Sequence, residues 1–174
     1  MDGYHLSRAQ LSAMPDPSNA HARRGAAFTF DASSFHQLLV ALRAPLAPES
    51  KTIYAPSFDH AKKDPVADDI AVPPSCRIVV LEGLYIALDE GSWAEARKEM
   101  DEVWFVEVDE NRARERLVMR HVKAGIATDE EDAGRRADEN DLVNGREIME
   151  KRGRVDEIVK SREDDEWRPE RQGM

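Results

Sequence analysis

Five consecutive residues, Arg77-Ile78-Val79-Val80-Leu81, place the strongest limit on the architecture of this chain. They follow the turn-forming segment Pro73-Pro74-Ser75 and stop at Glu82-Gly83. Continuous rather than alternating hydrophobicity is typical of a strand that is buried on both faces of a parallel sheet. The segment therefore predicts a strand inside a layered domain, covered by helices on both sides.

Two further segments predict strands. Residues 102–108 are rich in β-branched and aromatic side chains and are closed by Asp109. Residues 155–159 have the same character but a lower apolar content, so we expect this strand nearer to an edge of the sheet.

Helical patterns lie between the predicted strands. Asp31 is placed to cap a helix whose apolar residues recur at i, i+3, i+4 and i+7, and Pro45 ends that helix. Residues 110–123 predict a second helix, and the capping-box patterns that start at Ser92 and Thr128 predict two more helix starts. Strands that alternate with helices indicate an α/β domain with a mainly parallel sheet.

Composition excludes several classes of protein. The chain has 174 residues, enough for one domain with a sizeable core, and its formal charge of −10 repels polyphosphate backbones, so we expect no nucleic-acid binding. No apolar run approaches the ~20 residues of a membrane span, and residues 1–5 show no signal-peptide pattern. The single cysteine, Cys76, excludes an internal disulfide and fits a reducing compartment, so we expect a cytoplasmic protein.

Two short segments carry candidate catalytic groups. Asp2-Gly3-Tyr4-His5 combines a carboxylate with an imidazole, and a carboxylate at the end of a strand can accept the proton of a hydroxyl that attacks phosphorus. Glu82 follows the predicted central strand, at the sheet edge where open α/β folds bind ligands, and a carboxylate there suits Mg²⁺, directly or through water. The alternatives are a frayed terminus and a solvated turn.

Two other groups of polar residues are candidates for ligand binding. Tyr54, Asp59 and His60 lie in an aromatic and proline-containing segment that suits recognition of substrate hydroxyls, although an ordinary surface loop has the same composition. Arginines recur every four residues at Arg112, Arg116 and Arg120, a drift of ~40° per step on a helix, so they share one broad face. Arginine suits phosphate because its rigid fork donates in pairs, but such stripes are more often solvated.

Taken in order, these segments resemble the P-loop kinases related to uridine kinase, phosphoribulokinase and bacterial-type pantothenate kinase. Each motif is weak by itself, but together they span nearly the whole chain. The matching segments are MDGYHL (1–6), RRGAAFTFD (23–31), YAPSFDHAKKDPV (54–66), VVLEGLYIAL (79–88), WFVEVDENRARERLVMRHVKAGIA (104–127), ADENDLVNG (137–145) and VDEIVKS (155–161).

The resemblance implies a chemistry, Mg²⁺-dependent transfer of the ATP γ-phosphoryl group to a hydroxyl of a small molecule. It also implies a role for each matching residue. Asp2 corresponds to the catalytic carboxylate, and Glu82 to the acidic residue near the metal and the phosphates. Arg116 and Arg120 correspond to the mobile lid helix, and Ser161 to the start of the adenine-side loop. The positions that correspond to the acceptor side are His5, Asp31, Tyr54, Asp59 and His60.

One departure from the family is serious, because the 174 residues contain no G-x-x-x-x-G-K-[ST] sequence. In the family a strand, this phosphate-binding loop and a helix, roughly 30 residues or more, precede the MDG segment. The resemblance therefore implies a three-layer P-loop NTPase-like fold that lacks its first strand, phosphate loop and first helix. Phosphoryl transfer depends on positioning and charge stabilisation, so we expect the chain to be inactive without that loop. On this interpretation we expect Met1 to be an internal methionine that a shortened gene model or transcript takes as the start.

The expected organisation is one incomplete kinase-like domain over residues 1–160, with a lid at about 110–140, and a polar tail over 161–174. Two alternatives to an enzyme stay open, a catalytically dead relative that acts as a binding or regulatory module, and a fragment without function. The acceptor is equally open among nucleosides, sugars, pantothenate and glycerate-like compounds, and the sequence predicts no oligomeric state.

Overall fold

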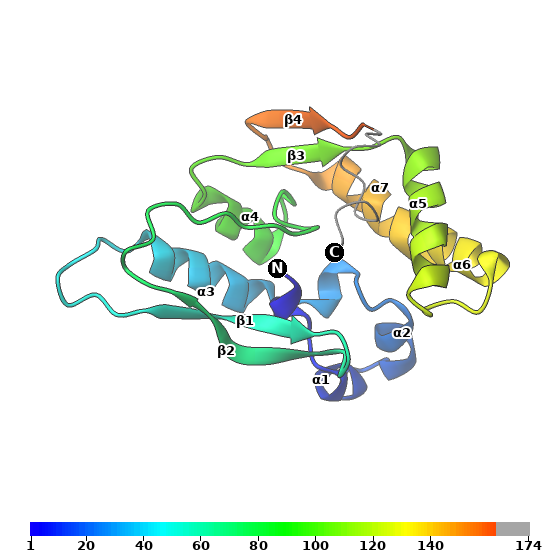
Figure 1. The fold of residues 1–174 in the computed structure, drawn as a ribbon, viewed down its shortest axis with the longest axis horizontal. Coiled ribbons are helices and arrows are strands. Elements are labelled where there is room, and N and C mark those ends of the chain that lie inside the picture. Colours follow the sequence, from blue (N-terminus) through cyan, green and yellow to red (C-terminus); the bar gives the residue numbers. More distant parts are fainter. Residues whose placement is uncertain (163–174) are drawn as a thin grey trace.

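Helices and short strands alternate along residues 1–162, which are the residues that the computed structural model describes (Figure 1). The elements are η1 (Asp2–Tyr4), α1 (Arg8–Ser12), α2 (Pro17–Ala22), η2 (Ala27–Thr29), α3 (Ala32–Arg43), β1 (Ile53–Asp59), β2 (Asp64–Val72), α4 (Gly91–Lys98), β3 (Trp104–Glu107), α5 (Glu110–Lys123), α6 (Glu130–Arg136), η3 (Ala137–Asp141), α7 (Leu142–Lys151) and β4 (Glu157–Lys160). Of the three η segments, η1 and η2 are 3₁₀ turns and η3 is a π-helix.

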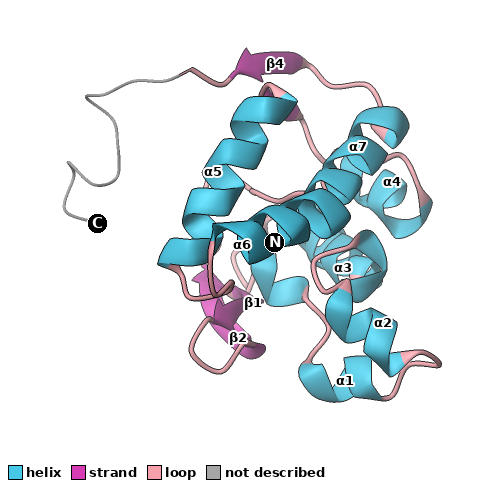
Figure 2. Cartoon of the chain, turned by 90° about the vertical axis from the view of Figure 1, so that its right-hand side faces the viewer, coloured by secondary structure: helices cyan, strands magenta, loops and turns pink. Residues whose placement is uncertain are grey.

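The strands of the described residues form two separate pairs. Strands β1 and β2 make an antiparallel hairpin, and β3 and β4 make a parallel pair in which Trp104 lies opposite Glu157. Figures 1 and 2 place these pairs on opposite sides of the molecule, with the helices between them. The α/β class is confirmed, but the expectation of one mainly parallel sheet is wrong for this part of the chain.

The predicted central strand over 77–81 is also wrong, because within residues 1–162 these residues form no strand. Ile78 is 83% exposed and Val80 is 87% exposed. A strand exists only when a neighbour satisfies its N–H and C=O groups, and neither strand pair extends to this segment. Its apolar sequence is therefore typical of a strand, but no strand of residues 1–162 pairs with its backbone.

The other two predicted strands are confirmed. Residues 102–108 contain β3, and 155–159 overlaps β4, which lies at an edge as expected because it pairs with β3 alone in the described chain. Asp156 holds the two together: its backbone N–H donates to the Val103 carbonyl, and its carboxylate accepts from the Val103 N–H, both at 2.8 Å.

The core forms around α3 and α4. As predicted, Asp31 caps α3, accepting the Ser34 N–H at 2.9 Å, and the apolar face of α3 is buried. Phe35 on this face packs on Trp93 of α4, with ring centroids 5.6 Å apart, and Trp93 also contacts the fully buried Tyr85. Local spacing was enough to predict α3 because its own side chains cap it and bury its face.

Helix α5 has the bounds that the sequence predicts, but the two capping boxes are displaced, by two residues in α4 and by one in α6. Helix α4 is capped by Glu90 without a side-chain hydrogen bond, so Ser92 lies inside the helix. Helix α6 is capped by Asp129, whose carboxylate accepts the Asp132 N–H at 2.8 Å, so Thr128 lies outside it. Asp129 competes with Thr128 for the cap, and a carboxylate is the stronger acceptor.

Helices α5, α6 and α7 form the right-hand side of the molecule in Figure 1, and the predicted lid region, 110–140, comprises α5, α6 and most of η3. Among the described helices, none is long and apolar enough to cross a membrane. The predicted polar tail, 161–174, lies outside the described residues from position 163 onward.

Candidate active site

A cavity of about 300 Å³, here called the small cavity, lies where η1, α5 and the start of α7 converge. It brings together three residues that the resemblance assigns to catalysis, acceptor binding and the lid, namely Asp2, His5 and Arg120. Its complete lining is Met1, Asp2, His5, Gly25, Phe30, Leu84, Leu117, Arg120, Asp141 and Asn144.

Glu82 lies beside the same cavity. The Met1 backbone nitrogen donates to the Glu82 carbonyl at 2.5 Å, and Gly83 lies so close that an added Cβ would be 2.1 Å from the Met1 Cγ. The chain after the predicted strand therefore contacts the chain at Asp2, and the side chains of Asp2 and Glu82 are both exposed. These two predicted carboxylate positions are neighbours in space although 80 residues separate them in the sequence.

Gly3 allows η1 to approach strand β1 closely. A Cβ at this position would lie 2.0 Å from the Pro56 carbonyl oxygen, which no side chain tolerates. Tyr4 and Leu6 then bond to the chain around η2: the Asp31 N–H donates to the Tyr4 carbonyl, and the Leu6 N–H to the Thr29 carbonyl, both at 2.8 Å. The glycine of the MDGYHL segment is therefore needed to place Asp2 and His5.

His5 is packed between aromatic rings, 4.0 Å from the Phe30 centroid and 5.0 Å from that of Phe58. Its Nδ1 lies 2.8 Å from the Asp2 carbonyl oxygen, which can only accept, so Nδ1 carries the proton and Nε2 has the lone pair. Burial lowers the pKa of His5, although the Asp2 carbonyl and carboxylate oppose this effect. The imidazole is thus neutral near pH 7 and holds the backbone of Asp2 in place.

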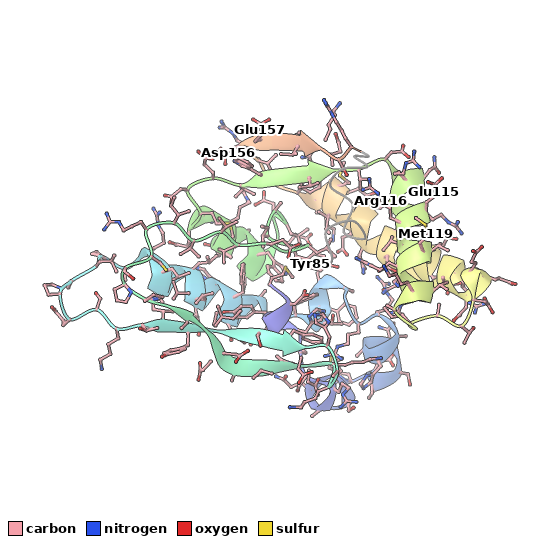
Figure 3. All side chains as sticks on the ribbon, in the orientation of Figure 1. Tyr85, Glu115, Arg116, Met119, Asp156 and Glu157 are labelled. Carbon is pink, nitrogen blue, oxygen red and sulfur yellow. The ribbon has the colours of Figure 1, made fainter. Side chains whose placement is uncertain are left out.

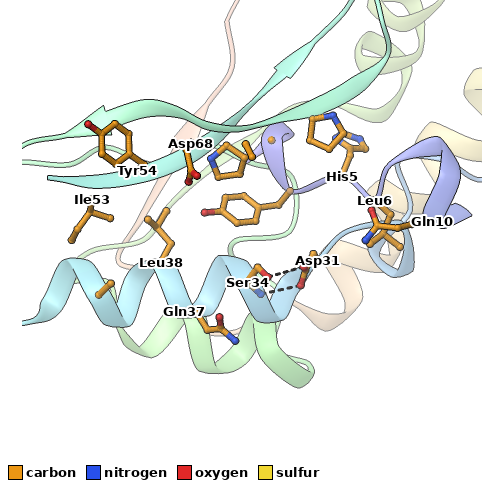
Figure 4. A pocket seen from close by; sticks show the side chains of 16 residues that line it. His5, Leu6, Gln10, Asp31, Ser34, Gln37, Leu38, Ile53, Tyr54 and Asp68 are labelled. Carbon is orange, nitrogen blue, oxygen red and sulfur yellow. Dashed lines mark hydrogen bonds between the residues drawn. The ribbon is translucent and has the colours of Figure 1, made fainter.

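A larger cavity of about 490 Å³, here called the large cavity, lies between α3 and the β1–β2 hairpin (Figure 4). It brings together three of the predicted acceptor-side residues, His5, Asp31 and Tyr54, and His5 is common to both cavities. Its complete lining is Gly3, Tyr4, His5, Leu6, Gln10, Asp31, Ser34, Gln37, Leu38, Ala41, Ile53, Tyr54, Pro56, Pro65, Ala67 and Asp68.

Neither Asp59, the last residue of β1, nor His60, in the turn that follows, lines either cavity. The Asp59 carboxylate accepts the N–H groups of Ala61 at 2.9 Å and Lys62 at 3.0 Å, and the Lys62 N–H does most to lower the Asp59 pKa. His60 is exposed, with its ring 5.2 Å from that of Phe58. Asp59 therefore stabilises the turn of the β1–β2 hairpin through these hydrogen bonds.

The arginine stripe on α5 divides into different environments. Arg112 pairs with Glu115 at 2.8 Å, and Arg120 lines the small cavity. Arg116 donates to the Ser161 hydroxyl at 2.9 Å, which joins two residues that the resemblance assigns to phosphate and nucleotide binding. In Figure 3, Arg116 lies on the side of α5 that faces the rest of the molecule, whereas Glu115 points away from it.

Sequence reasoning missed a polar cluster beside the small cavity. Arg23 donates from Nε to the Asn140 side chain at 2.9 Å and from Nη2 to the Asn144 side chain at 2.8 Å. His121, which is 3% exposed, lies with its Nε2 2.9 Å from the Asp141 carboxylate. The matching signal was the ADENDLVNG segment, but only the π-helix η3 shows that Asn140 and Asp141 turn toward different partners.

No group of three or more His, Cys, Asp or Glu side chains in residues 1–162 is arranged to hold a metal. Mg²⁺ in phosphoryl-transfer sites usually takes one or two carboxylates and completes its shell with waters and substrate phosphates. The exposed carboxylate of Glu82, in a segment that contacts Met1, fits that mode of binding, in which the nucleotide supplies most of the ligands.

Comparisons with known proteins identify the relatives of this arrangement. No family model matches the chain. It is 52% identical over 159 residues to the ATP-dependent kinase-like protein notR′ of Aspergillus versicolor, covering 91% of this chain and 92% of that protein. It is 42% identical over 144 residues to the uridine kinase-like protein C227.14 of Schizosaccharomyces pombe, covering 83% of this chain and 60% of that protein.

Solved structures agree with these relatives. The crystal structure of YFH7 from Saccharomyces cerevisiae, a P-loop-containing kinase with a circular permutation, superposes with a TM-score of 0.82 at 34% identity, covering 94% of this chain and 57% of that one. A fructose transport system kinase from Silicibacter superposes with a TM-score of 0.78 at 32% identity, covering 91% and 71%. The chain thus spans about the whole of notR′ but only 60% and 55% of C227.14 and YFH7.

Proposed function

Since this chain belongs to the P-loop kinases that include YFH7 and uridine kinase-like proteins, we propose that it serves the transfer of the ATP γ-phosphoryl group to a hydroxyl of a small molecule. The observation that carries the proposal is the small cavity, in which a carboxylate, Asp2, and a lid arginine, Arg120, face the same space. A base for the acceptor and a cation for the phosphates are two of the groups that this reaction needs from the protein.

Each side chain has a distinct task in this proposal. The acceptor lies in the large cavity with its hydroxyl directed past His5 toward Asp2, which takes the hydroxyl proton. The new O–P bond forms as the bond between the β–γ bridging oxygen and the γ-phosphorus breaks, and ADP leaves. Arg120 and Arg116 stabilise the charge on the phosphates, as arginines of closing lids do.

The remaining assignments follow the same scheme. Glu82 would hold Mg²⁺, directly or through water, and the ion neutralises phosphate charge when bound. Ser161, oriented by Arg116, contributes to the nucleotide side. His5 positions Asp2 through its backbone carbonyl, while Asp31 and Tyr54 contact the acceptor. Asp59 and His60 reach the acceptor only if the hairpin turn bends toward the large cavity.

A phosphate-binding strand, loop and helix from outside the 174 residues completes the enzyme in this proposal. The G-x-x-x-x-G-K-[ST] sequence is absent from them, and its backbone N–H groups and lysine are what cradle the phosphates. The same absence favours a second candidate function, a kinase relative that binds the small molecule as a regulatory module and does not use ATP.

The test joins the strand–loop–helix unit of YFH7 upstream of Met1 and measures phosphate transfer from ATP to a panel of hydroxyl compounds, with and without EDTA. We expect turnover by the fusion, none by the 174-residue chain, and no heat of Mg-ATP binding to the chain in calorimetry. If the fusion binds an acceptor but transfers nothing, the regulatory module is the better reading.

The Asp2→Asn variant of the fusion tests the base. We expect turnover to fall by about 10²–10⁴, with ATP affinity nearly unchanged, because the carboxamide cannot accept the hydroxyl proton. The matched control is Asp101→Asn, which makes the same change at a surface residue paired with Arg43. Near-normal turnover by Asp2→Asn would show that the base is another group.

A further inference from the structure

The charged side chains that line the large cavity are all acidic among the described residues. Two carboxylates line it, Asp31 from the start of α3 and Asp68 from β2, and Figure 4 shows them on opposite walls. Among the described residues that line it, none is a lysine or an arginine. The other polar groups on its walls are neutral hydroxyls and carboxamides, such as Ser34 and Gln37, and apolar side chains such as Ile53 and Leu38 cover much of the remaining surface.

The one lining residue that can become cationic stays neutral near pH 7. Burial between Phe30 and Phe58 holds the pKa of His5 below its usual value. On the same wall, burial raises the pKa of Tyr4 to about 12, and the negative charge of Asp31 adds to that rise. Tyr4 is therefore a neutral phenol near pH 7, and the Asp31 carboxylate is close enough to raise its pKa electrostatically.

Nearby arginines do not balance the two carboxylates, because they are held by a third one. Arg24 donates to the Asp64 carboxylate at 3.3 Å and to the Leu6 carbonyl at 3.1 Å. Arg8 donates to Asp64 through its backbone N–H at 2.8 Å and through Nε at 3.3 Å. Asp64 thus binds both guanidinium groups beside β2, outside the lining of the large cavity.

We propose that the large cavity selects an uncharged or cationic hydroxyl compound with an apolar portion, and that it rejects acceptors carrying a phosphate or carboxylate. An anion would meet the half-buried Asp31 carboxylate and the exposed Asp68 carboxylate, and no described lining residue offers it a counter-charge, so like-charge repulsion disfavours it. The volume of about 490 Å³ suits a small molecule of drug or nucleoside size. This inference rests on the proposed function in treating the bound compound as the phosphoryl acceptor. It excludes pantothenate-like and glycerate-like compounds from the candidate acceptors, because both carry a carboxylate.

The test measures the charge of the cavity directly, without ATP or turnover. In a Cys76→Ser background, Ser34→Cys places a thiol on the cavity wall, and its reaction rates with a cationic (trimethylammonium) and an anionic (sulfonate) methanethiosulfonate are compared at low salt. Both reagents react with the same thiolate, so the ratio of the cationic to the anionic rate does not depend on the fraction of thiol that is ionised. The same ratio is measured at the exposed native Cys76. The quotient of the ratio at the introduced thiol over the ratio at Cys76 then removes the effect of the protein's net charge.

We expect this quotient to exceed about ten, because each nearby carboxylate attracts one reagent and repels the other. Asp31→Asn should lower it several-fold, and Asp68→Asn should lower it by a smaller factor because Asp68 lies on the opposite wall. Asparagine keeps the helix cap at position 31 and tolerates the positive φ of 52° at position 68. The matched control is Asp69→Asn, whose side chain bonds to Ser57 and does not line the cavity.

A quotient near one, or one that Asp69→Asn lowers as much as Asp68→Asn, would overturn the proposal. Should Ser34→Cys disturb the cap of α3, Ala67→Cys on the opposite wall reports on the same space. Failure of the phosphotransfer assay together with a high quotient would remove the proposed function and leave the charge selection of the cavity standing.

Discussion

Gly3 is the residue whose replacement has the clearest steric consequence. It is buried, and the space where a Cβ would lie is already occupied by the Pro56 carbonyl of β1. This contact sets the distance between η1 and the hairpin, and through it the positions of Asp2 and His5 on the walls of the two cavities.

For Gly3→Ala we therefore expect a loss of about 1–3 kcal/mol in the free energy of unfolding, because the backbone of η1 or β1 must shift. Gly145→Ala is the matched control: nothing lies within 4 Å of its added Cβ, and alanine inside α7 should stabilise by about 0.5–1 kcal/mol. Urea denaturation of both variants measures the difference. Equal stability of the two variants would mean that η1 can shift away from β1 without a cost in free energy.

His5 links the pH to the stability of the same region. Burial puts the folded-state pKa below the unfolded value of about 6.5, so in that window the unfolded chain binds more protons. The contribution of His5 is complete above about pH 6.5 and is lost as the pH falls through the folded-state pKa. We expect the melting temperature to rise between about pH 5 and 7, and His5→Gln to flatten that rise. An unchanged slope in His5→Gln would contradict it.

At the scale of elements, α5 is fastened to the segment that follows it. Arg114 binds the Asp138 carboxylate through two nitrogens, at 2.7 and 2.8 Å, and Arg146 reaches back to Glu110 at 2.9 Å. His121 and Asp141 make the buried contact between α5 and η3. These contacts join α5 to η3 and α7, so we expect any motion of the predicted lid to carry these elements together.

Replacing the buried partner should loosen this unit. In His121→Phe the Asp141 carboxylate loses its partner in a poorly hydrated place, which costs about 1–3 kcal/mol locally. We expect amide hydrogen exchange in η3 and in residues 124–127 to accelerate about tenfold or more. The comparison is Arg114→Ala, which removes an exposed pair and should have a smaller effect. Equal effects would show that the buried contact has no special weight.

For the whole molecule, the exposed run at 77–81 is the main liability. Ile78 and Val80 present apolar side chains to solvent, and Trp104 and Val106 of β3 are 60% and 65% exposed. Unpaired strand-forming sequence and exposed apolar surface both promote association of chains. In the proposed complete enzyme, the additional strand would cover this surface.

The isolated chain should accordingly be poorly stable, melting below the ~45–65 °C range of ordinary mesophile domains and scattering light on warming. The double change Ile78→Thr and Val80→Thr should reduce scattering and dye binding while leaving the melting temperature nearly unchanged, because the replaced side chains are exposed. Cooperative unfolding above about 65 °C would refute the expectation.

Local patterns were sufficient for α3, α5, β3 and β4. Asp31 and Asp109 accept hydrogen bonds from their own helices, and the apolar spacing of α3 selects its buried face, so a short stretch of sequence contains the whole cause. The sequence alone also indicated the family, because the order of the matching segments along the chain, from MDGYHL to VDEIVKS, can be read without a structure.

Contacts between distant segments decide the rest. Residues 77–81 have a strand-forming sequence and no partner among the described residues, and β structure depends on a neighbour that local sequence does not contain. The meeting of Asp2 with Arg120, and the sharing of His5 by two cavities, likewise arise from chain packing across more than a hundred residues. The charge of the large cavity is of this kind too, because packing places Asp31 and Asp68 on its walls while Arg8 and Arg24 bind Asp64 outside its lining.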